Sequence, residues 1–384
     1  MKAALGMIIK SVDSEKELMN FILNASMFGH KLDCVIVAYT HNLSLGVKEK
    51  ISELIPFHTV DTKNPHYCIE KMRHHGVPDD QAKILCECPV NTDRGLIPYG
   101  FNRNLVVMEA ILRGIDTLFF VDSDVYPTVL KQKPNGAALE KVDFFGAHLA
   151  HLNNGSDATT GEYSGYNILP PCKFDGMDDL LDGVQKSCMK QYWQTSEAHR
   201  SLVFQPDNAN AVPSNKILGG NSAIKLSSFA KLPPFFSSQY IVDDEMFFSR
   251  GEDTVLGLEI KKSGIVCTDV GIYPMHDTYK DFPTEPNLKS DRNTQERFYY
   301  ACTGWVGRNP FLNYLLGNDL KATRERQRKS LEKGLNALSK YSSNPKFKKV
   351  LRNFDVSWDN TDRYISEYER TREAWSVFTE RLGL

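Results

Sequence analysis

The sequence lacks the features of a membrane-spanning or a nucleic-acid-binding protein. No stretch approaches the ~20 apolar residues that cross a bilayer. The apolar run at the amino terminus, residues 3–9, is short for a signal peptide and leads into acidic residues. The formal net charge is −2, which argues against a chain that binds nucleic acid as a whole. We therefore expect a cytoplasmic protein that binds no nucleic acid.

Paired cysteines and the two common nucleotide-binding loops are also missing. The eight cysteines include no CxxC pair, and a disulfide framework is unusual in a chain of 384 residues, so we expect mostly reduced thiols. The sequence contains neither GxGxxG nor GxxxxGKS/T, which excludes a Rossmann dinucleotide loop and a P-loop.

What the sequence does have is an alternation of apolar strands and amphipathic helices. Hydrophobic residues make up 41% and charged residues 24% of the chain, as in ordinary globular proteins. The alternation predicts a mostly parallel sheet flanked by helices. Strands are expected at residues 3–9, 33–39, 57–60, 117–121, 217–224, 265–270 and 271–274. Helices are expected at residues 46–54, 102–113 and 251–262, together with one capped by Ser14 with Glu17 and ended by Gly29.

Three stretches have weaker patterns. Residues 61–99 show no periodicity and predict a long loop with one helix, whereas residues 144–149, FFGAHL, favour another strand. Residues 152–216 are rich in Asn, Gly, Ser, Asp and Pro, with a helix expected around residues 180–193. So long a weakly patterned segment is more often a binding loop than a simple connection.

The stretch from Asp116 to Pro127, DTLFFVDSDVYP, places two acids at the end of a strand. Residues 117–121 predict a strand buried on both faces, and Asp122 and Asp124 follow it, where open α/β sheets bind ligands. Carboxylates at i and i+2 of a strand point the same way and repel each other unless a cation such as Mg²⁺ or Mn²⁺ lies between them. The same residues also fit a polar turn, and these twelve residues do not decide between the two interpretations.

Later parts of the chain add further candidate groups. Glu252 and Asp253 follow Gly251 at the start of an expected helix, so Asp253 is either a general base or a helix cap. His276 follows an expected strand, and a carboxylate pair with one imidazole is a plausible Mn²⁺ shell. The pair Gly219-Gly220 marks either a bulge in a strand or a close approach of the backbone to a ligand.

Taken in this order, the motifs resemble those of nucleotide-sugar glycosyltransferases of the GT-A type. Asn102-Arg103-Asn104 is similar to the "ARN" element of that family, and Asp122-Ser123-Asp124 matches its DxD motif. GGNSAI, from Gly219, resembles the glycine-rich strand beside the donor sugar. Gly251-Glu252-Asp253 resembles the acidic motif of inverting members, and His276 is placed like their late metal-binding histidine. The resemblance covers roughly residues 1–285.

The resemblance implies a GT-A fold, a Rossmann-like mixed sheet flanked by helices, and a division of the chain. A catalytic domain is expected at residues 1–308, with a nucleotide-binding half at 1–125 and an acceptor and catalytic half at 126–308. A helical carboxy-terminal appendage is expected at residues 309–384, where Leu331, Leu335 and Leu338 form an apolar stripe and basic residues are abundant. We favour the interpretation that these basic helices pack on the core or form a homodimer. The alternative is that they touch an anionic membrane face.

The resemblance also implies roles for individual residues. The metal, Mn²⁺ or Mg²⁺, is expected on Asp122, Asp124 and His276. Asp253 is expected to be the general base of an inverting transfer, with Glu252 binding acceptor or donor hydroxyls. The nucleotide-sugar donor is expected to contact Arg103, Asn104, Thr40, Asp122, Gly219, Gly220 and Asn221. Thr40 lies in Tyr39-Thr40-His41, where many members have an aspartate for the base; UDP is favoured over GDP.

Other functions stay open at this point. A retaining GT-A glycosyltransferase shares the same motifs, and a non-catalytic carbohydrate-binding protein can share the fold. A sugar-phosphate nucleotidylyltransferase needs a glycine-rich basic loop after the first strand, which residues 10–13, KSVD, do not supply. The expected partners are a nucleotide sugar and a glycan, lipid-linked or small-molecule acceptor.

Overall fold

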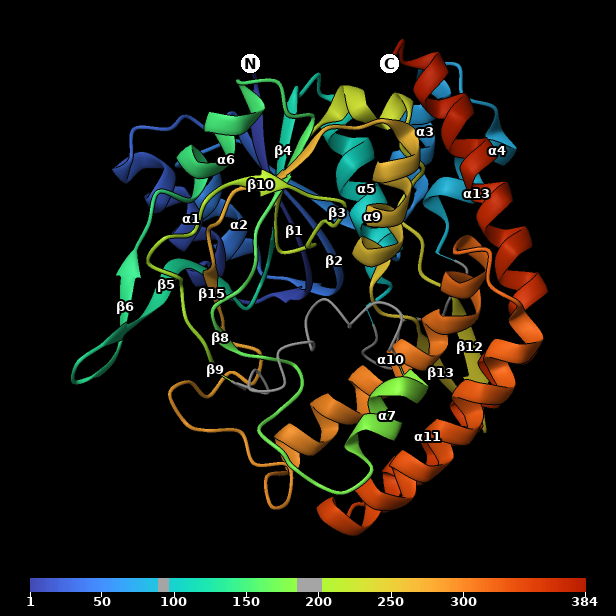
Figure 1. Ribbon diagram of the computed structural model, residues 1–384. Coiled ribbons are helices and arrows are strands. Elements are labelled where there is room, and N and C mark those ends of the chain that lie inside the picture. The colour runs from blue at the N-terminus through green and yellow to red at the C-terminus, as the bar shows by residue number, and fades with distance from the viewer. Residues whose placement is uncertain (89–96, 185–201) are drawn as a thin grey trace.

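An eight-stranded mixed sheet forms the centre of the structure, a computed structural model that describes residues 1–88, 97–184 and 202–384 (Figure 1). The first four strands lie parallel in the order β3-β2-β1-β4, and β11 joins β4 antiparallel. In sheet order the strands are β10 (Val212–Pro213), β14 (Cys267–Asp269), β7 (Ala158–Thr160), β11 (Asn221–Lys225), β4 (Thr117–Asp122), β1 (Ala3–Val12), β2 (Cys34–Leu43) and β3 (Phe57–Asp61). The expected mixed α/β sheet is confirmed.

Helices cover both faces of this sheet, and the alternation of side chains along β4 decides which residues meet them. Leu118 and Phe120 belong to one hydrophobic core, and Phe119 and Val121 to another on the opposite face. The first core includes residues of α3 (His66–His74), α4 (Asp79–Cys86), α5 (Tyr99–Leu112), η2 (Leu226–Ala230), α9 (Glu252–Ser263) and α13 (Thr361–Arg381). The second includes residues of α1 (Lys16–Met27), α2 (Leu45–Ser52) and α6 (Phe144–Leu152).

Several expected elements differ in the structure. Residues 144–149 are not a strand but belong to α6, because Asp143 caps the helix by accepting from the Gly146 amide and Phe144, Phe145, His148 and Leu152 are buried at helical spacing. In the segment 61–99, the described residues up to 88 hold two helices, α3 and α4, instead of one.

Smaller corrections concern element ends. The capping box at Ser14 does not form, since Glu15 is the N-cap of α1 and Ser14 accepts from the Lys16 amide. The glycine pair precedes β11 and does not interrupt it. Of the helix expected around residues 180–193, the structure describes α7 (Met177–Val184), and the part from 185 onward lies outside the described residues.

The carboxy-terminal helices share a third core with residues from the middle of the chain. They are α10 (Arg292–Leu315), α11 (Leu320–Ser342), η3 (Pro345–Lys348) and α12 (Lys349–Asp359), and α7 lies against α11 (Figure 1). The apolar stripe on α11 is buried in this core together with Tyr240 and Phe247. The helical part begins at Arg292, and the division expected between residues 308 and 309 falls inside α10.

Five basic residues of these helices make ion pairs with acids of the same chain. Arg328 pairs with Asp355, Lys346 with Glu296, and similar pairs join Arg324 to Asp359, Arg326 to Asp182 and Lys333 to Asp179. Within the described ranges, no helix combines the length and the apolarity that a membrane crossing requires.

Three small sheets complete the described secondary structure and position the later motifs. They are formed by β15 (Pro274–His276), β5 (Val125–Lys133) and β6 (Gly136–Lys141), by β12 (Gln239–Val242) and β13 (Glu245–Phe248), and by β8 (Gly165–Tyr166) and β9 (Leu202–Val203). Since His276 pairs with Val125 in the first of these sheets, it lies beside the turn that follows β4.

Candidate active site

The candidate site lies at the carboxyl end of β4, where the chain leaves the main sheet and enters the small sheet of β5. Asp122 is the last residue of β4 and shares the face of Phe120, which is the face covered by α5. Ser123 and Asp124 form a turn before β5. The side chains of Asp122, Asp124 and His276 are 19–26% exposed, so a ligand can reach them.

A buried arginine joins the two acidic motifs. Arg103 of α5 is 2% exposed and donates from Nη2 to Asp122 Oδ1 (2.8 Å), from Nε to Glu252 Oε1 (2.8 Å) and from Nη1 to the Gly219 carbonyl (2.7 Å). Burial lowers the pKa of Arg103, but the charges of Asp122 and Glu252 outweigh it and the net shift is upward. Burial raises the pKa of Glu252, and Arg103 opposes that shift. Arg103 therefore lies beneath the site and orients both acids.

The second acid of the strand-end motif contacts the histidine. Asp124 Oδ1 lies 3.3 Å from His276 Nε2, and Asp124 Oδ2 lies 3.8 Å from an Nη atom of Arg297 in α10. Burial raises the pKa of Asp124, but the charges of His276 and Arg297 outweigh it and bring that pKa to about 2. Burial lowers the pKa of His276, and the carboxylate of Asp124 reverses this and raises it. The ring of Tyr163 lies 4.7 Å from the imidazole, between centroids.

The glycine pair brings the backbone close to both acidic motifs. The Gly219 amide donates to Asp253 Oδ2 (3.1 Å), and the Gly220 amide donates to the Tyr163 hydroxyl (2.8 Å). A Cβ on Gly219 would overlap the guanidinium of Arg103, and a Cβ on Gly220 would overlap Asp122 Oδ2. Only glycine fits at these two positions, because any side chain would displace the charged groups.

Asp253 is held from two sides at the start of α9. Its Oδ2 accepts from Gly219, and its Oδ1 accepts from the Thr254 amide at 2.7 Å and, more weakly, from the Thr254 hydroxyl at 3.4 Å. The carboxylate is half-buried, and Oδ2, which accepts one hydrogen bond, keeps a lone pair for a further one. This geometry suits a fixed base as well as a helix cap.

Three residues expected to contact the donor hold parts of the fold together. Asn104 is buried and bridges the Phe235 backbone, donating to its carbonyl and accepting from its amide. Thr40 is also buried, and its hydroxyl donates to the Lys10 carbonyl between β2 and β1. Asn221 lies opposite Val121 in the antiparallel pairing, which directs its side chain to the other face, where it meets His148 of α6.

The donor set at the strand end fits a hard divalent cation. Asp124 and His276 are in contact, and Asp122 adds a carboxylate whose Oδ1 is occupied by Arg103. Within residues 1–88, 97–184 and 202–384, no group of three His, Cys, Asp or Glu side chains is already arranged around a metal position. Substrate phosphate and water would complete the coordination, as is usual for Mg²⁺ in such sites.

Four residues near the site were not singled out from the sequence. Tyr163, Arg297 and Arg308 lie outside the recognised motifs, and Arg297 and Arg308 are interior residues of α10. Arg250 directly precedes Gly251-Glu252-Asp253, so its position beside that motif was a local signal. Arg308 is 3% exposed and donates to the Thr254 hydroxyl (3.1 Å).

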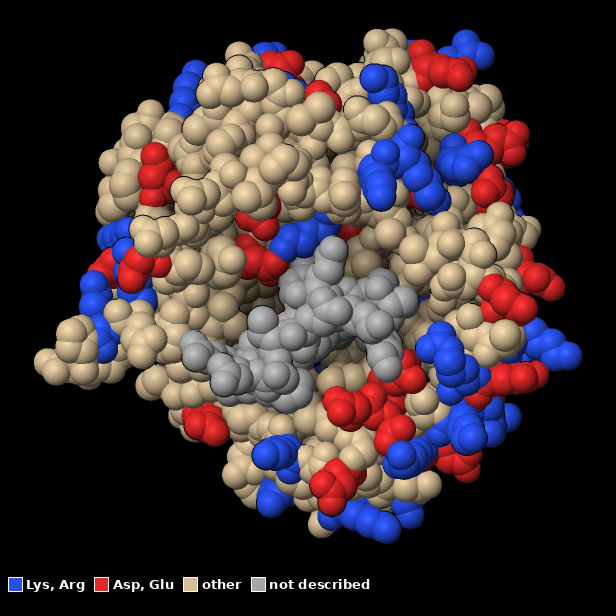
Figure 2. Space-filling view, viewed as in Figure 1, with Lys and Arg blue, Asp and Glu red and all other residues tan. Residues whose placement is uncertain are grey.

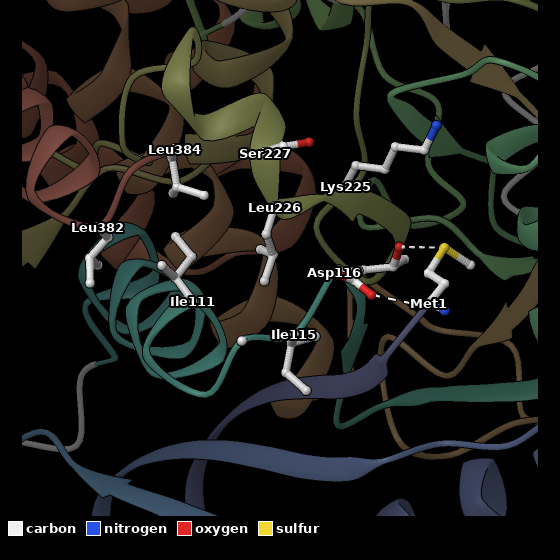
Figure 3. Close-up of a pocket in the computed structure, with 11 residues that line it drawn as sticks. Met1, Ile111, Ile115, Asp116, Lys225, Leu226, Ser227, Leu382 and Leu384 are labelled. Carbon is white, nitrogen blue, oxygen red and sulfur yellow. Dashed lines mark hydrogen bonds and ion pairs between the residues drawn. The ribbon is translucent and has the colours of Figure 1, made fainter.

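Two cavities lie away from these residues. One, of about 470 Å³, lies at the opposite end of β4, where Ile111, Ile115, Leu226 and Leu382 line it (Figure 3). The other, of about 380 Å³, lies between α4, α5 and α13. Open α/β sheets bind ligands at the carboxyl ends of their strands, so we assign the site by its polar groups and not by cavity volume.

Comparison with known proteins gives only distant likenesses. Neither a model of a known protein family nor a curated protein matches the sequence. Glucosyl-3-phosphoglycerate synthase from Mycobacterium tuberculosis, solved with phosphoglyceric acid, is 12% identical over 83% of this chain and 80% of that chain, with a TM-score of 0.41. S. aureus TarS, residues 1–349, is 12% identical over 100% and 92% of the two chains, with a TM-score of 0.38. These values are too low to carry an argument about function.

Replacing Arg103 tests the buried network. Arg103→Met leaves the Asp122 and Glu252 carboxylates without their cation, and we expect the free energy of unfolding in urea to fall by about 3–5 kcal/mol. Adding Glu252→Gln should recover part of the loss, because it removes one unpaired charge. Arg324→Met, which breaks a surface pair between α11 and α12, should cost less than about 1 kcal/mol. Equal losses for the two arginines would contradict the network.

The pH dependence of stability tests the contact between α6 and β11. His148 is fully buried, its ring nitrogens contact Thr159 and Asn221, and burial lowers its pKa to about 4. Between pH 6.5 and 4 the unfolded chain takes up a proton that the folded protein does not. As the pH is lowered through this range, the contribution of His148 therefore reduces the free energy of unfolding by about 3 kcal/mol. The free energy of unfolding, measured in urea at several pH values, should depend less on pH across this window in His148→Gln than in the wild type. An unchanged slope would show that His148 does not titrate in this way.

Proposed function

We propose that the protein is a metal-dependent glycosyltransferase that moves a sugar from a nucleotide diphosphate sugar, UDP in preference to GDP, to an acceptor hydroxyl. The observation that supports this is the pairing of Asp124 with His276 beside Asp122, with Asp253 fixed on the other side of the glycine pair. The two acidic motifs, about 130 residues apart in sequence, are joined through one arginine, Arg103.

In this proposal the strand-end acids anchor the donor. Asp122, Asp124 and His276 hold the divalent cation, which supplies positive charge for the diphosphate leaving group. Arg297, beside Asp124, adds a second cation near the same phosphates. The missing side chains at Gly219 and Gly220 let Arg103 and Asp122 lie against this backbone, which fixes the acid that would face the donor.

The acceptor side of the proposed mechanism is the start of α9. Asp253 takes the proton of the acceptor hydroxyl as its oxygen bonds to the anomeric carbon, and the bond from that carbon to the diphosphate breaks. The amides of Gly219 and Thr254 fix the carboxylate for this role. Attack from the face opposite the leaving group gives inversion. Glu252 is fixed by Arg103 and lies behind Asp253 in the buried network.

The distant likeness to the Mycobacterium tuberculosis synthase guides the choice of probes. That enzyme has been solved with Mn²⁺, UDP-glucose and phosphoglyceric acid, at 12% identity over 83% of this chain and 80% of that one, with a TM-score of 0.40. UDP-glucose with Mn²⁺ is therefore the first member of a donor screen that continues through other UDP- and GDP-sugars, read out by binding and by donor hydrolysis.

Asp124→Ala tests the metal assignment. We expect this variant to lose at least about 10-fold in Mn²⁺-dependent affinity for UDP, measured by calorimetry with and without Mn²⁺, because it removes a metal ligand. Asp116→Ala removes an exposed acid at the other end of β4 and should bind UDP like the wild type. If no nucleotide binds to the wild-type protein with Mn²⁺, the proposed function is wrong.

Asp253→Asn tests the base. Asn has nearly the size of Asp but cannot take up the proton, and its side chain can accept from only one of the Gly219 and Thr254 amides. We therefore expect nucleotide binding to persist and kcat for transfer to fall by ~10²–10⁴-fold. Glu259→Gln, on the same helix and paired with Lys262, should transfer at the wild-type rate. Full transfer activity in Asp253→Asn would exclude the inverting base and favour a retaining mechanism.

A further inference from the structure

Arg250 occupies an unusual position beside the start of α9. Its guanidinium lies 5.6 Å from the ring centroid of Tyr99, and its amide donates to the Gly304 carbonyl (3.1 Å). Its aliphatic part packs so closely on α10 that a Cβ on Gly304 would overlap it. The side chain is half-buried. Arg250 is therefore held in one place by an aromatic ring and a glycine, and it does not swing freely in solvent.

Among the residues that the structure describes, no carboxylate is paired with this arginine. Arg103 is matched by Asp122 and Glu252, and Arg297 lies against Asp124. Across residues 1–88, 97–184 and 202–384, Arg250 has no ion pair. Partial burial of a cation is unfavourable unless an anion compensates it. A half-buried, fixed and unmatched arginine in a ligand site is a common way to recognise phosphate or carboxylate.

Arg250 comes two residues before the start of α9, which the proposed function assigns to the acceptor. Gly251, the next residue, is the N-cap of α9 and adopts a left-handed conformation (φ 90°). Arg308 closes on Gly251 and reaches Asp253 through the Thr254 hydroxyl, which fixes the first turn of the helix. The amino end of a helix adds further attraction for an anion. In the proposed function the donor phosphates belong with Asp122, Asp124 and His276, which come from the end of β4, the turn after it and β15.

The surface around the site has both signs of charge. Figure 2 shows acidic and basic side chains side by side at the hollow near the middle of this face. A neutral sugar acceptor would be bound through hydroxyl and amide groups. With such an acceptor, the partly buried cation would stay without an anion, which is unfavourable in free energy. An anionic acceptor matches the arginine and keeps the acid Asp253 free for proton transfer.

We propose that the acceptor carries an anionic group, a phosphate or a carboxylate, close to the hydroxyl that is glycosylated, and that Arg250 binds this group. The inference rests on the proposed function. In the reaction the acceptor oxygen bonds to the anomeric carbon of the sugar, the bond to the nucleotide diphosphate breaks, and the hydroxyl proton passes to Asp253. The anion does not react; it positions the hydroxyl.

Sulfate binding to the loaded protein tests the anion site directly. With UDP and Mn²⁺ saturating, the donor phosphate positions are filled, so calorimetric titration with sulfate reports a separate anion site. We expect wild type to bind sulfate and Arg250→Gln to bind it about 10- to 100-fold more weakly, as for the loss of charged hydrogen bonds. Arg250→Lys should recover part of the affinity. Arg324→Gln, a surface arginine of α11, should bind sulfate like the wild type.

An acceptor series provides the second readout. Glycerol, glycerol 3-phosphate and glycerate all carry hydroxyl groups, but glycerol has no anionic group and the other two have a phosphate or a carboxylate. Each is tested as an acceptor in the presence of the donor that the screen selects. We expect the anionic compounds to exceed glycerol in kcat/KM by at least about 10-fold, and Arg250→Gln to raise their KM while the Kd for UDP stays within about 2-fold. Preference for phosphate or for carboxylate separates the two anions.

The outcomes separate the two proposals. If UDP binds with Mn²⁺ but sulfate does not bind to the loaded protein, or binds equally to Arg250→Gln, the anionic acceptor is excluded and the transferase proposal stands. If glycerol accepts the sugar as efficiently as the anionic compounds do, the anionic acceptor is likewise excluded and the transferase proposal stands. Failure of nucleotide binding overturns the proposed function, and the acceptor inference fails with it.

Discussion

The arrangement of the site depends on one buried guanidinium. Arg103 is 2% exposed and connects α5, the end of β4, the Gly219 backbone and the first residue of α9. Removing such a group from water costs several kcal/mol, and two carboxylates and a carbonyl are needed to offset that cost. The positions of Asp122 and Glu252 are therefore coupled, since neither can move without leaving a buried charge unpaired.

This coupling explains the two glycines. A side chain at Gly219 would enter the space of the guanidinium, and one at Gly220 would enter that of Asp122. The glycine-rich stretch thus keeps the backbone against the charged groups, and the Gly219 amide extends the network to Asp253. In the proposed function, the donor anchor and the base belong to one rigid unit.

The sequence predicted the parts of the site that follow local rules. The buried strand ending in Asp122, the helix beginning after Gly251 and the strand leading to His276 were all recognisable, because each has a short pattern of apolar residues followed by a turn or cap. In the structure, alternation along β4 places Asp122 on the face of Phe120. These elements gave the mixed α/β sheet and the order of the motifs.

Other features depend on contacts that no local pattern contains. Arg103 and Glu252 are 149 residues apart, so only the folded chain shows that the arginine serves two acids. Asn221 belongs to a matching motif, but the antiparallel register opposite Val121 turns it toward His148. Residues 144–149 have strong strand propensity, yet the Asp143 cap and burial at helical spacing make them part of α6.

α10, the first of the carboxy-terminal helices, contacts the candidate site. The boundary expected at residue 308 divides a single helix, and the residues on its two sides act together. Arg297 reaches Asp124, Gly304 receives Arg250, and Arg308 holds the start of α9. α10 buries apolar residues such as Phe298 and Trp305 in the third core, and it also directs Arg297 toward Asp124 and Arg308 toward the start of α9. α10 is therefore one wall of the candidate site, and in the proposed function it would contribute to acceptor binding together with the end of the sheet.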